Sequence, residues 1–323
     1  MLVSRTPLRI SFLGGGTDFP WFFEEHGGAV ISGAINKFIF INGLPSYDEK
    51  TFYLKYSALE VVKELSKIQH PIFRTALEHF SADPMDISVM AEIPAGNGLA
   101  SSSAFSVGLI NLILAARGEF VSQPELAELA IKLELDLLHE PIGVQDQLGS
   151  SFGGVNYHQF SKNRTIVSKP LFTTEKELPF ELLLSKVGVG ARQASSFTAA
   201  QKEFVDANPA AIRALEELRD LTIEAGGSIA SDPASLPAYI REGWNLKQAS
   251  NPNAVSQEIV ELCEKLTRGG ALATKLLGAG GGGFVLSIFN PGRLQEFLAL
   301  DETISEISTQ VKIDYRGAIV LEV

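Results

Sequence analysis

Apolar and polar positions along the first half of the chain predict short strands followed by helices. Leu8–Leu13 is apolar enough for a buried strand, and it runs directly into three glycines. Ala29–Ala34 and Lys37–Asn42 are rich in β-branched and aromatic residues, so we expect two strands that are able to pair with each other. Ser103–Arg117 is apolar on nearly every side and is followed by Gly118, which predicts a buried helix.

Pro124–Leu138 has the clearest amphipathic pattern of a helix. Pro124 suits the first helical turn, and apolar side chains repeat at helical spacing. Glu134 lies at the margin of this apolar stripe, so we expect its carboxylate to be partly buried, with an ordinary solvent-facing glutamate as the alternative. The stripe consists of Leu126, Leu129, Ala130, Leu133 and Leu137.

The second half of the chain follows a polar, proline-containing stretch at Lys169–Pro179. Strands and helices alternate in both halves, which predicts an α+β fold, and we place a domain boundary in this stretch, giving domains 1–174 and 175–323. The elements predicted beyond it are a strand at Phe180–Val189, a helix at Asn208–Gly226 with an asparagine cap and a glycine stop, a helix at Ser256–Arg268 and a strand at Phe284–Phe289.

Composition and charge narrow the classes of partner. The chain has 323 residues, of which 45% are apolar and 20% charged, as in ordinary globular proteins. Its formal net charge of −11 argues against nucleic acid and membrane partners, because both require a basic face. Since it also lacks a spanning apolar run and a signal-peptide core, we expect a cytoplasmic protein. Its single cysteine, Cys263, permits no internal disulfide and falls on the apolar side of a predicted helix.

Three loops are rich in glycine and other small residues: Gly14–Asp18, Pro94–Ser103 and Gly278–Gly283. The second loop runs into the predicted buried helix, so its amides and the positive end of the helix dipole would converge on one anion site. Its serines add hydroxyls suited to phosphate oxygens or a hydrated Mg²⁺. A tight turn is the simpler explanation for any one of these loops, although less so for three of them together.

Familiar nucleotide and zinc motifs do not fit. Gly278, Gly280 and Gly283 satisfy G-x-G-x-x-G, but the dinucleotide fingerprint needs a helix after the glycines, and here a strand follows. No Gly-Lys pair occurs, which excludes a Walker A loop. The five histidines show no spacing typical of metal ligands, so we expect no zinc site.

The three loops lie within segments that resemble the motifs of GHMP kinases, the family of galactokinase, homoserine kinase, mevalonate kinase and phosphomevalonate kinase. Arg5–Asp18 is similar to the first motif, Pro94–Ala104 to the second and Lys275–Gly283 to the third, in the family's order. The resemblance implies an ATP-dependent kinase with two α+β domains and an active-site cleft between them. The opening RTPLRISFLGGGTD is most similar to D-glycero-D-manno-heptose 7-phosphate kinases, which phosphorylate the anomeric hydroxyl. Galactokinases carry Glu-His where this chain has Gly15-Gly16.

The resemblance also implies roles for particular residues. Asp146 matches the catalytic aspartate, and Arg9 matches the basic residue paired with it. Ser102 and Glu134 match the magnesium ligands, so ATP and Mg²⁺ are expected. The implied ATP-binding residues are Pro94, Gly96, Asn97, Gly98, Leu99, Ala100, Ser101, Ser102 and Ser103. The implied substrate-binding residues are Gly15, Gly16, Thr17, Asp18, Gly280 and Gly281.

Several of these residues have simpler explanations. Asp146 suits a turn before Gln147, and Asp18 suits an Asx-turn or a helix cap. Arg192 lies in a small-residue loop after a predicted strand. Because arginine binds phosphate bidentately, we interpret Arg192 as a clamp for the substrate's phosphate, with a solvated surface arginine as the alternative.

Two other functions compete with a heptose 7-phosphate kinase. One is a kinase for a free sugar such as L-fucose. The other is a nucleotide-binding regulator without catalysis, which is less consistent with the sequence because Asp146, Ser102 and Glu134 are all retained. The sequence does not predict the oligomeric state.

Overall fold

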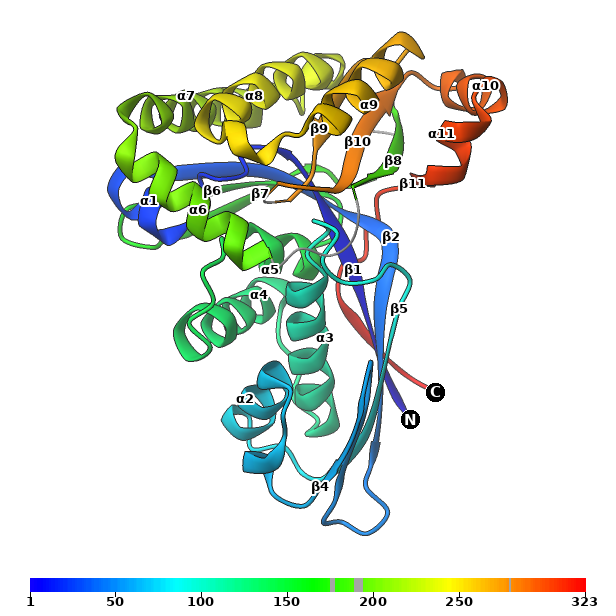
Figure 1. The fold of residues 1–323 in the computed structure, drawn as a ribbon. Helices are drawn as coiled ribbons and strands as arrows, with labels where there is room; N and C mark the ends of the chain where they lie inside the picture. The colour runs from blue at the N-terminus through cyan, green and yellow to red at the C-terminus, as the bar shows by residue number, and fades with distance from the viewer. Residues whose placement is uncertain (175–177, 189–193, 279) are drawn as a thin grey trace.

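The computed structural model describes residues 1–174, 178–188, 194–278 and 280–323, and it confirms the α+β fold. In these ranges the strands form one sheet of eight and one of four. Figure 1 shows helices covering the upper side, above the strands, and a second group of helices against the long strands below. None of the helices described is both long and apolar enough to cross a membrane.

The larger sheet contains both ends of the chain. Strands β1 and β12 pair antiparallel, so the two termini lie side by side (Figure 1). The strand order is β12 (Ile319–Glu322), β1 (Leu2–Leu13), β2 (Gly28–Pro45), β5 (Met85–Ala91), β3 (Phe52–Lys55) and β4 (Leu59–Val62), while β6 (Val155–Phe160) joins β2 and β7 (Ile166–Phe172) joins β6.

The predicted pairing of Ala29–Ala34 with Lys37–Asn42 is wrong, because both belong to the single long strand β2. The residues between them, Ile35 and Asn36, include no glycine or proline that would reverse the chain. The strand changes partner instead: Gly28–Gly33 pairs with β6, and Ile39–Pro45 pairs with β5.

Helix α3 (Ser101–Ala116) is the buried helix that the sequence predicts. It packs across β1 and β2, and a Cβ at Gly108 would lie 2.7 Å from Thr6 Oγ1, so a glycine permits this close approach. The neighbouring helices are α1 (Pro20–His26), α2 (Pro71–His79), α4 (Gln123–Ile131) and α5 (Gln145–Ser151).

The predicted helix Pro124–Leu138 is helical over almost that range, with a change in its hydrogen bonding. Ser122 and Glu125 form a capping box at the start of α4. After Ile131 the chain widens into the π-helical segment η2 (Lys132–Leu137), where the Leu138 amide donates to the Leu133 carbonyl. Such π-helical segments are frequent at functional sites, and this one carries Glu134.

The smaller sheet has its own hydrophobic core. Its strand order is β11 (Ser308–Val311), β8 (Glu181–Val187), β10 (Gly283–Phe289) and β9 (Ala273–Leu276). Helix α9 (Gln257–Arg268) buries Ile259 and Leu266 against this sheet, and the partly buried Cys263 packs there as predicted. The remaining helices are α6 (Ala194–Ala207), α7 (Pro209–Ser228), α8 (Leu236–Ser250), α10 (Arg293–Leu300) and α11 (Glu302–Ile307).

Helix α7 begins where the sequence predicts but does not end at the predicted glycine. The Asn208 side chain accepts a hydrogen bond from the Ala210 amide, which caps the helix. The helix then continues through Gly226 to Ser228. A Cβ at Gly226 would lie 2.5 Å from the ring of Tyr157, so this glycine provides room for packing rather than a stop.

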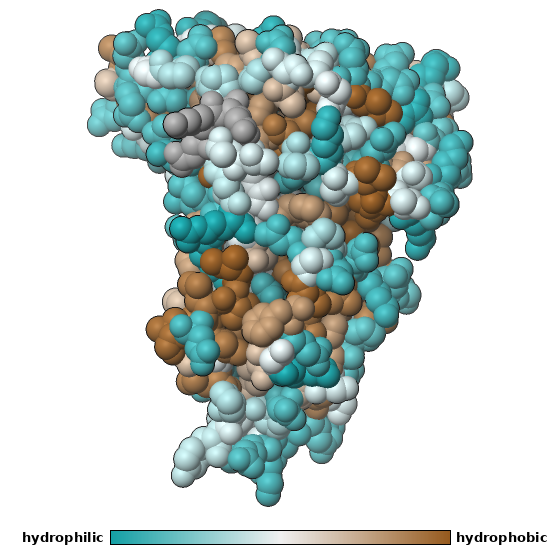
Figure 2. Space-filling view, turned by 180° about the vertical axis from the view of Figure 1, so that it is seen from behind, coloured by the Kyte–Doolittle hydropathy of each residue, from teal (hydrophilic) through white to brown (hydrophobic). Residues whose placement is uncertain are grey.

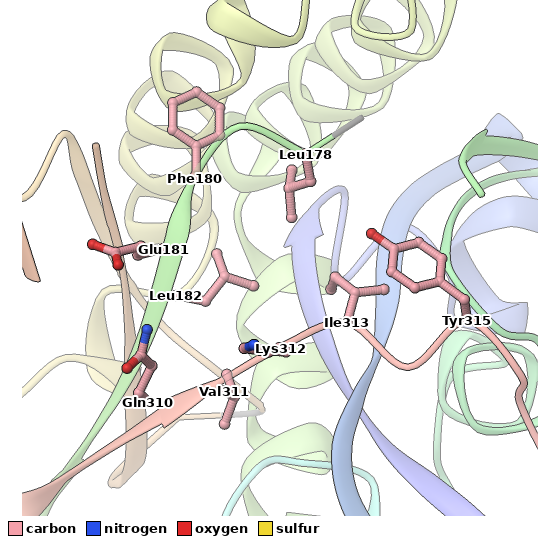
Figure 3. A pocket seen from close by; sticks show the side chains of 9 residues that line it. All are labelled: Leu178, Phe180, Glu181, Leu182, Gln310, Val311, Lys312, Ile313 and Tyr315. Atoms are coloured by element: carbon pink, nitrogen blue, oxygen red, sulfur yellow. The ribbon is translucent and has the colours of Figure 1, made fainter. Parts of the chain in front are cut away.

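The chain passes from the larger to the smaller sheet after β7 and returns after β11. Figure 3 shows residues of the two passages on one cavity, with Leu178 and Phe180 from the first and Ile313 and Tyr315 from the second. Because β12 returns to the larger sheet, the last residues of the chain lie apart from the sheet that precedes them. The division into domains 1–174 and 175–323 stays a prediction.

The face of the larger sheet that points away from α3 carries apolar side chains. Phe40 pairs with Met90 across β2 and β5, and Leu44 and Leu321 are exposed on the same face. Figure 2 shows the molecule from behind, with brown apolar surface gathered over its lower half, where these strands lie.

Candidate active site

Arg9 and Asp146 form the centre of the candidate site. Strand β1 places Arg9, which is 3% exposed, beside the first turn of α5, where Asp146 lies. Arg9 Nε and Nη2 both donate to Asp146 Oδ1, at 2.9 and 2.5 Å. Arg9 Nη1 also donates to the Gly98 carbonyl at 2.8 Å. One guanidinium therefore holds a carboxylate and the second glycine loop together.

The second glycine loop ends at the N-terminus of α3. Ala100 takes a left-handed conformation, with φ of 63°, and Ser101 starts the helix. The first amides of a helix have no acceptor within the helix itself, so they are free to bind an anion. Ser101 is 7% exposed, and its hydroxyl has no hydrogen-bond partner among the described residues. The side chain of Ser102, in contrast, is exposed.

The third glycine loop touches the second. A Cβ at Gly278 would lie 2.7 Å from Gly98 Cα, and a Cβ at Gly98 would lie 2.7 Å from the Leu277 carbonyl oxygen. Both glycines also have positive φ, of 81° and 77°. The two loops, 180 positions apart in the sequence, therefore meet backbone to backbone, and neither position has room for a side chain.

Glu134 is buried behind the first turn of α3. The residue is only 1% exposed. The hydroxyls of Ser103 and Ser106 donate hydrogen bonds of 2.8 Å to its two carboxylate oxygens, and the side-chain amide of Gln147 donates to one of them as well. Burial raises the pKa of Glu134 to about 7, although these hydrogen bonds oppose the shift. No cationic side chain among the described residues pairs with it.

Asp18 is held between the first glycine loop and α5. The Gly16 amide donates to Asp18 Oδ1 at 2.9 Å, and the Gln145 amide and side chain also donate to the carboxylate. Helix α1 is capped at Phe19 without a side-chain bond, so Asp18 does not cap it. Burial raises the pKa of Asp18, and the nearby charge of Asp146 adds to the shift.

A cavity of about 160 Å³ connects these parts. Asp146 and Asp18 both line it, together with Ser101 and Ser102 at the end of the second loop. The predicted site residues that line the cavity are Arg9, Gly16, Asp18, Gly96, Gly98, Ala100, Ser101, Ser102 and Asp146.

Other predicted residues lie near the cavity without lining it. The Thr17 hydroxyl lies within hydrogen-bond distance of the Gly14 and Ala29 carbonyls, and the side-chain amide of Asn97 donates to the Pro94 carbonyl. Gly280 and Gly281 pack against Ala254. The residues of this group are Gly15, Thr17, Pro94, Asn97, Leu99, Ser103, Glu134, Gly280 and Gly281. Arg192 lies outside the described residues.

The side chains of the site that were not singled out in the sequence include two glutamines and a lysine. Gln145 precedes Asp146 on α5, Gln201 comes from α6, and Lys247 comes from α8. Lys247 Nζ donates to the Gly278 carbonyl at 3.0 Å. Burial lowers the pKa of Lys247 to about 8, and the Asp18 carboxylate opposes that shift. Gln201 and Lys247 lie in ordinary amphipathic helices, so only the folded arrangement identifies them.

Lys275, which precedes the third loop, turns away from the cavity. It is 4% exposed, and its Nζ donates to the carbonyls of Ser11 and Phe12 at 2.8 and 3.1 Å. In the described part of the chain, no three His, Cys, Asp or Glu side chains gather as they would around a metal ion.

Two family models match the chain. The model for the GHMP kinases N terminal domain matches residues 60–154, and the model for the GHMP kinases C terminal region matches residues 227–299. Together they span just over half of the sequence. Each matched range contains residues that line the cavity described above. The first includes the second glycine loop, Glu134 and Asp146, and the second includes Lys247 and Gly278.

Similar proteins include kinases of sugars and of sugar phosphates. A D-glycero-alpha-D-manno-heptose 7-phosphate kinase from Campylobacter jejuni is 24% identical over 89% of this chain and 89% of its own. A galactokinase from Thermococcus kodakarensis is 24% identical over 95% of this chain and 93% of its own. The crystal structure of a D-glycero-D-manno-heptose 1-phosphate kinase from Bacteriodes thetaiotaomicron has the same fold, with a TM-score of 0.78 and 19% identity over 100% and 99% of the two chains.

The matched regions, the loop order and the fold are mutually consistent. The chain carries the glycine loop at a helix N-terminus in one matched region and the loop that meets it within the other. The chain therefore belongs to the GHMP kinases, a family of ATP-dependent kinases.

Proposed function

We propose that this chain transfers the γ-phosphate of ATP to the anomeric hydroxyl of D-glycero-D-manno-heptose 7-phosphate, giving the 1,7-bisphosphate. The choice of a phosphorylated heptose rests on the opening motif and on similarity to a heptose 7-phosphate kinase over most of both chains.

The observation that carries the proposal is the double contact of Arg9. Its guanidinium bonds the Asp146 carboxylate and the Gly98 carbonyl of the glycine loop. Phosphoryl transfer depends mainly on positioning and charge stabilisation. A carboxylate fixed beside a phosphate-binding loop would orient the acceptor hydroxyl. The hydroxyl oxygen then bonds the γ-phosphorus as the bond from that phosphorus to ADP breaks, and the hydroxyl proton passes to the Asp146 carboxylate or leaves with the transferred phosphate.

The triphosphate would be bound by the Pro94–Ser103 loop and the start of α3. Ala100, Ser101 and Ser102, at the start of the helix, line the cavity, and the helix dipole favours negative charge there. The Ser101 hydroxyl, buried without a partner among the described residues, supplies a further donor. The exposed Ser102 hydroxyl lines the same cavity.

The side chains around Glu134 support a proposal for a magnesium ion. Glu134 is a buried carboxylate with no cationic partner in the described ranges, and serine hydroxyls surround it. Carboxylate and hydroxyl oxygens are the hard ligands that Mg²⁺ prefers. We propose that Ser102 and Glu134 hold the ion, which would neutralise charge on the phosphates. Ser103 and Ser106 would then orient the Glu134 carboxylate.

Turnover on a panel of acceptors tests the proposal. ADP release would be measured with heptose 7-phosphate, unphosphorylated heptose, L-fucose, galactose and mevalonate, each with ATP and Mg²⁺. We expect the highest kcat/KM with heptose 7-phosphate. Higher kcat/KM with a free sugar would show that the acceptor carries no phosphate, and it would also remove the reason for assigning Arg192 as a phosphate clamp.

A further inference from the structure

Two buried amide groups in the cavity lack hydrogen-bond partners. Gln201 is 3% exposed, and its Nε2 has no partner among the described residues. Gln145 is 9% exposed; its Nε2 donates to Asp18, whereas its Oε1 has no partner within the same ranges. Buried polar groups are almost always paired, so an unpaired donor and an unpaired acceptor in one cavity indicate a missing polar partner.

Both amides lie against the glycines of the first loop. A Cβ at Gly16 would lie 3.3 Å from Gln201 Nε2, and a Cβ at Gly15 would lie 3.3 Å from Gln145 Nε2. Lys247 Nζ lies 3.6 Å from the same Gly15 position. Polar groups from α5, α6 and α8 therefore gather around two residues that have no side chains.

The chemistry of this group suits adjacent hydroxyls on a sugar. Gln201 Nε2 is a donor only, and Gln145 Oε1 is an acceptor only. A hydroxyl both donates and accepts, so neighbouring hydroxyls can satisfy both amides at once. The Lys247 ammonium has three donor hydrogens, of which one bonds the Gly278 carbonyl. Asp18 also lines the cavity, and its carboxylate is a further acceptor there.

We propose that Gln201, together with Gln145 and Lys247, binds the hydroxyl groups of the acceptor and so contributes to its selection. This inference rests on the proposed function, because it needs a polyhydroxylated acceptor in this cavity. It goes beyond that function by placing the recognition of a vicinal diol on α6 and α8, helices that carry none of the three sequence motifs. Gln201 would contribute binding energy to the acceptor without taking part in the transfer itself.

Replacement of Gln201 by methionine is the direct test, because methionine keeps the length of the side chain and removes its amide. In the full chain, Gln201→Met should raise the KM for the acceptor on the order of tenfold, as loss of a sugar hydrogen bond does. The KM for ATP should stay within about twofold, and kcat should fall much less than kcat/KM for the acceptor. Gln295→Met, on the exposed face of α10, is the matched control and should change none of these values.

Deoxy acceptors provide a second measurement that does not depend on a variant folding. With the wild-type protein, removal of the hydroxyl that Gln201 contacts should raise the KM by a similar factor. In Gln201→Met the same deoxy acceptor should be no worse than the parent acceptor, because the contact is already lost. Equal KM values for the parent and all deoxy acceptors would overturn the inference.

The outcomes separate this inference from the proposed function. Wild-type turnover with an unchanged acceptor KM in Gln201→Met would overturn the inference alone. If Gln201→Met changed only the melting temperature and left the acceptor KM unchanged, water rather than the acceptor would satisfy the two amides, and the inference would again be overturned. No turnover by the wild-type protein on any sugar or sugar phosphate would overturn the proposed function and the inference together.

Discussion

The guanidinium of Arg9 donates to two parts of the site at once, the Asp146 carboxylate and the Gly98 carbonyl. A planar group with a fixed set of donors suits this use, because bonds in two directions hold both partners at a defined separation. Asp146 keeps a quarter of its side chain exposed despite this pairing. It can therefore contact a ligand in the cavity while its orientation is fixed from behind.

Asp146→Asn tests whether this carboxylate acts on the acceptor. Asparagine keeps an oxygen that accepts from Arg9, so we expect the fold and ATP binding to persist. Loss of the charged carboxylate should lower kcat by roughly 10²–10⁴-fold, the range typical for a positioned acid or base. Steady-state turnover and calorimetric binding of a non-hydrolysable ATP analogue would measure the two effects separately.

The exposed Asp136 provides the control for that substitution. Asp136→Asn removes a carboxylate from η2, and this side chain lies 3.8 Å from Arg164 at the surface. Its kcat should match that of the wild-type protein. Near-normal turnover in Asp146→Asn would show instead that another carboxylate, with Asp18 the first to examine, acts on the acceptor.

His158 predicts a pH dependence of stability. Burial lowers its pKa to about 3 from the ordinary value of 6.5. Between these values the unfolded chain binds a proton that the folded chain does not, so the free energy of unfolding falls as the pH is lowered. We expect this residue to account for a loss of about 2 kcal/mol between about pH 7 and about pH 5. Urea unfolding across that range would measure it.

His158→Gln should remove this part of the pH dependence, whatever it does to stability at neutral pH. The exposed His79, at the end of α2, supplies the matched control. His79→Gln should leave the slope of unfolding free energy against pH as in the wild-type protein. An unchanged slope in His158→Gln would mean that folding does not lower the pKa of His158.

Active-site residues were predictable where they belong to a short sequence motif. They were not predictable where only the tertiary structure brings them to the cavity. Arg9 and Asp146 were expected as a pair from the resemblance, and the structure brings their side chains into contact. Gln201 and Lys247 lie more than 50 residues beyond Asp146, on helices whose patterns show only amphipathicity. No local signal distinguishes them from other polar residues on the same helices.

At the scale of elements, the two glycine loops that meet at Gly98 and Gly278 depend on each other's shape. Gly278→Ala should destabilise the protein for two reasons: the position has a positive φ, and the new Cβ would lie 2.7 Å from Gly98 Cα. We expect about 1–2 kcal/mol of lost stability from the backbone conformation and ~1–3 kcal/mol more from the contact. Displacement of the phosphate loop should also raise the KM for ATP.

Gly270→Ala separates those two causes. Gly270 also has positive φ, of 99°, but apart from its two chain neighbours no described residue has an atom within 4 Å of the position of its Cβ. It should therefore show only the backbone cost, with unchanged KM for ATP. Equal losses in the two variants would contradict the close contact between the loops, and thermal unfolding with steady-state kinetics would distinguish the cases.

Whether the sequence predicted an element depended on how local its determinants are. The buried pattern of α3 and the Asn208 cap of α7 are short-range features, and both predictions are confirmed. The two errors have long-range causes. Strand β2 continues where a turn was expected because β6 and β5 each pair with one part of it. Gly226 remains helical because the ring of Tyr157 packs against it.

At the scale of the whole molecule, strands that pair across the chain were beyond prediction from the sequence. Strand β12 joins β1 although about 300 residues separate them, and nothing in the four residues of β12 specifies that partner. The contact between the two sheets also joins residues that are far apart in the sequence. Lys275 of β9, in the smaller sheet, reaches the carbonyls of Ser11 and Phe12 in β1 of the larger sheet.

Lys275→Met would measure how strongly this contact joins the two sheets. Burial lowers the pKa of Lys275 well below its usual range, so the buried ammonium is itself costly. Its hydrogen bonds oppose that cost, and their loss would leave two carbonyls without this donor. We expect the free energy of unfolding to fall by about 1–3 kcal/mol, measured by chemical denaturation. The exposed Lys186 of β8 is the control, and Lys186→Met should be nearly neutral. A more stable Lys275→Met would show that desolvation of the ammonium outweighs its bonds, and that other contacts hold the sheets together.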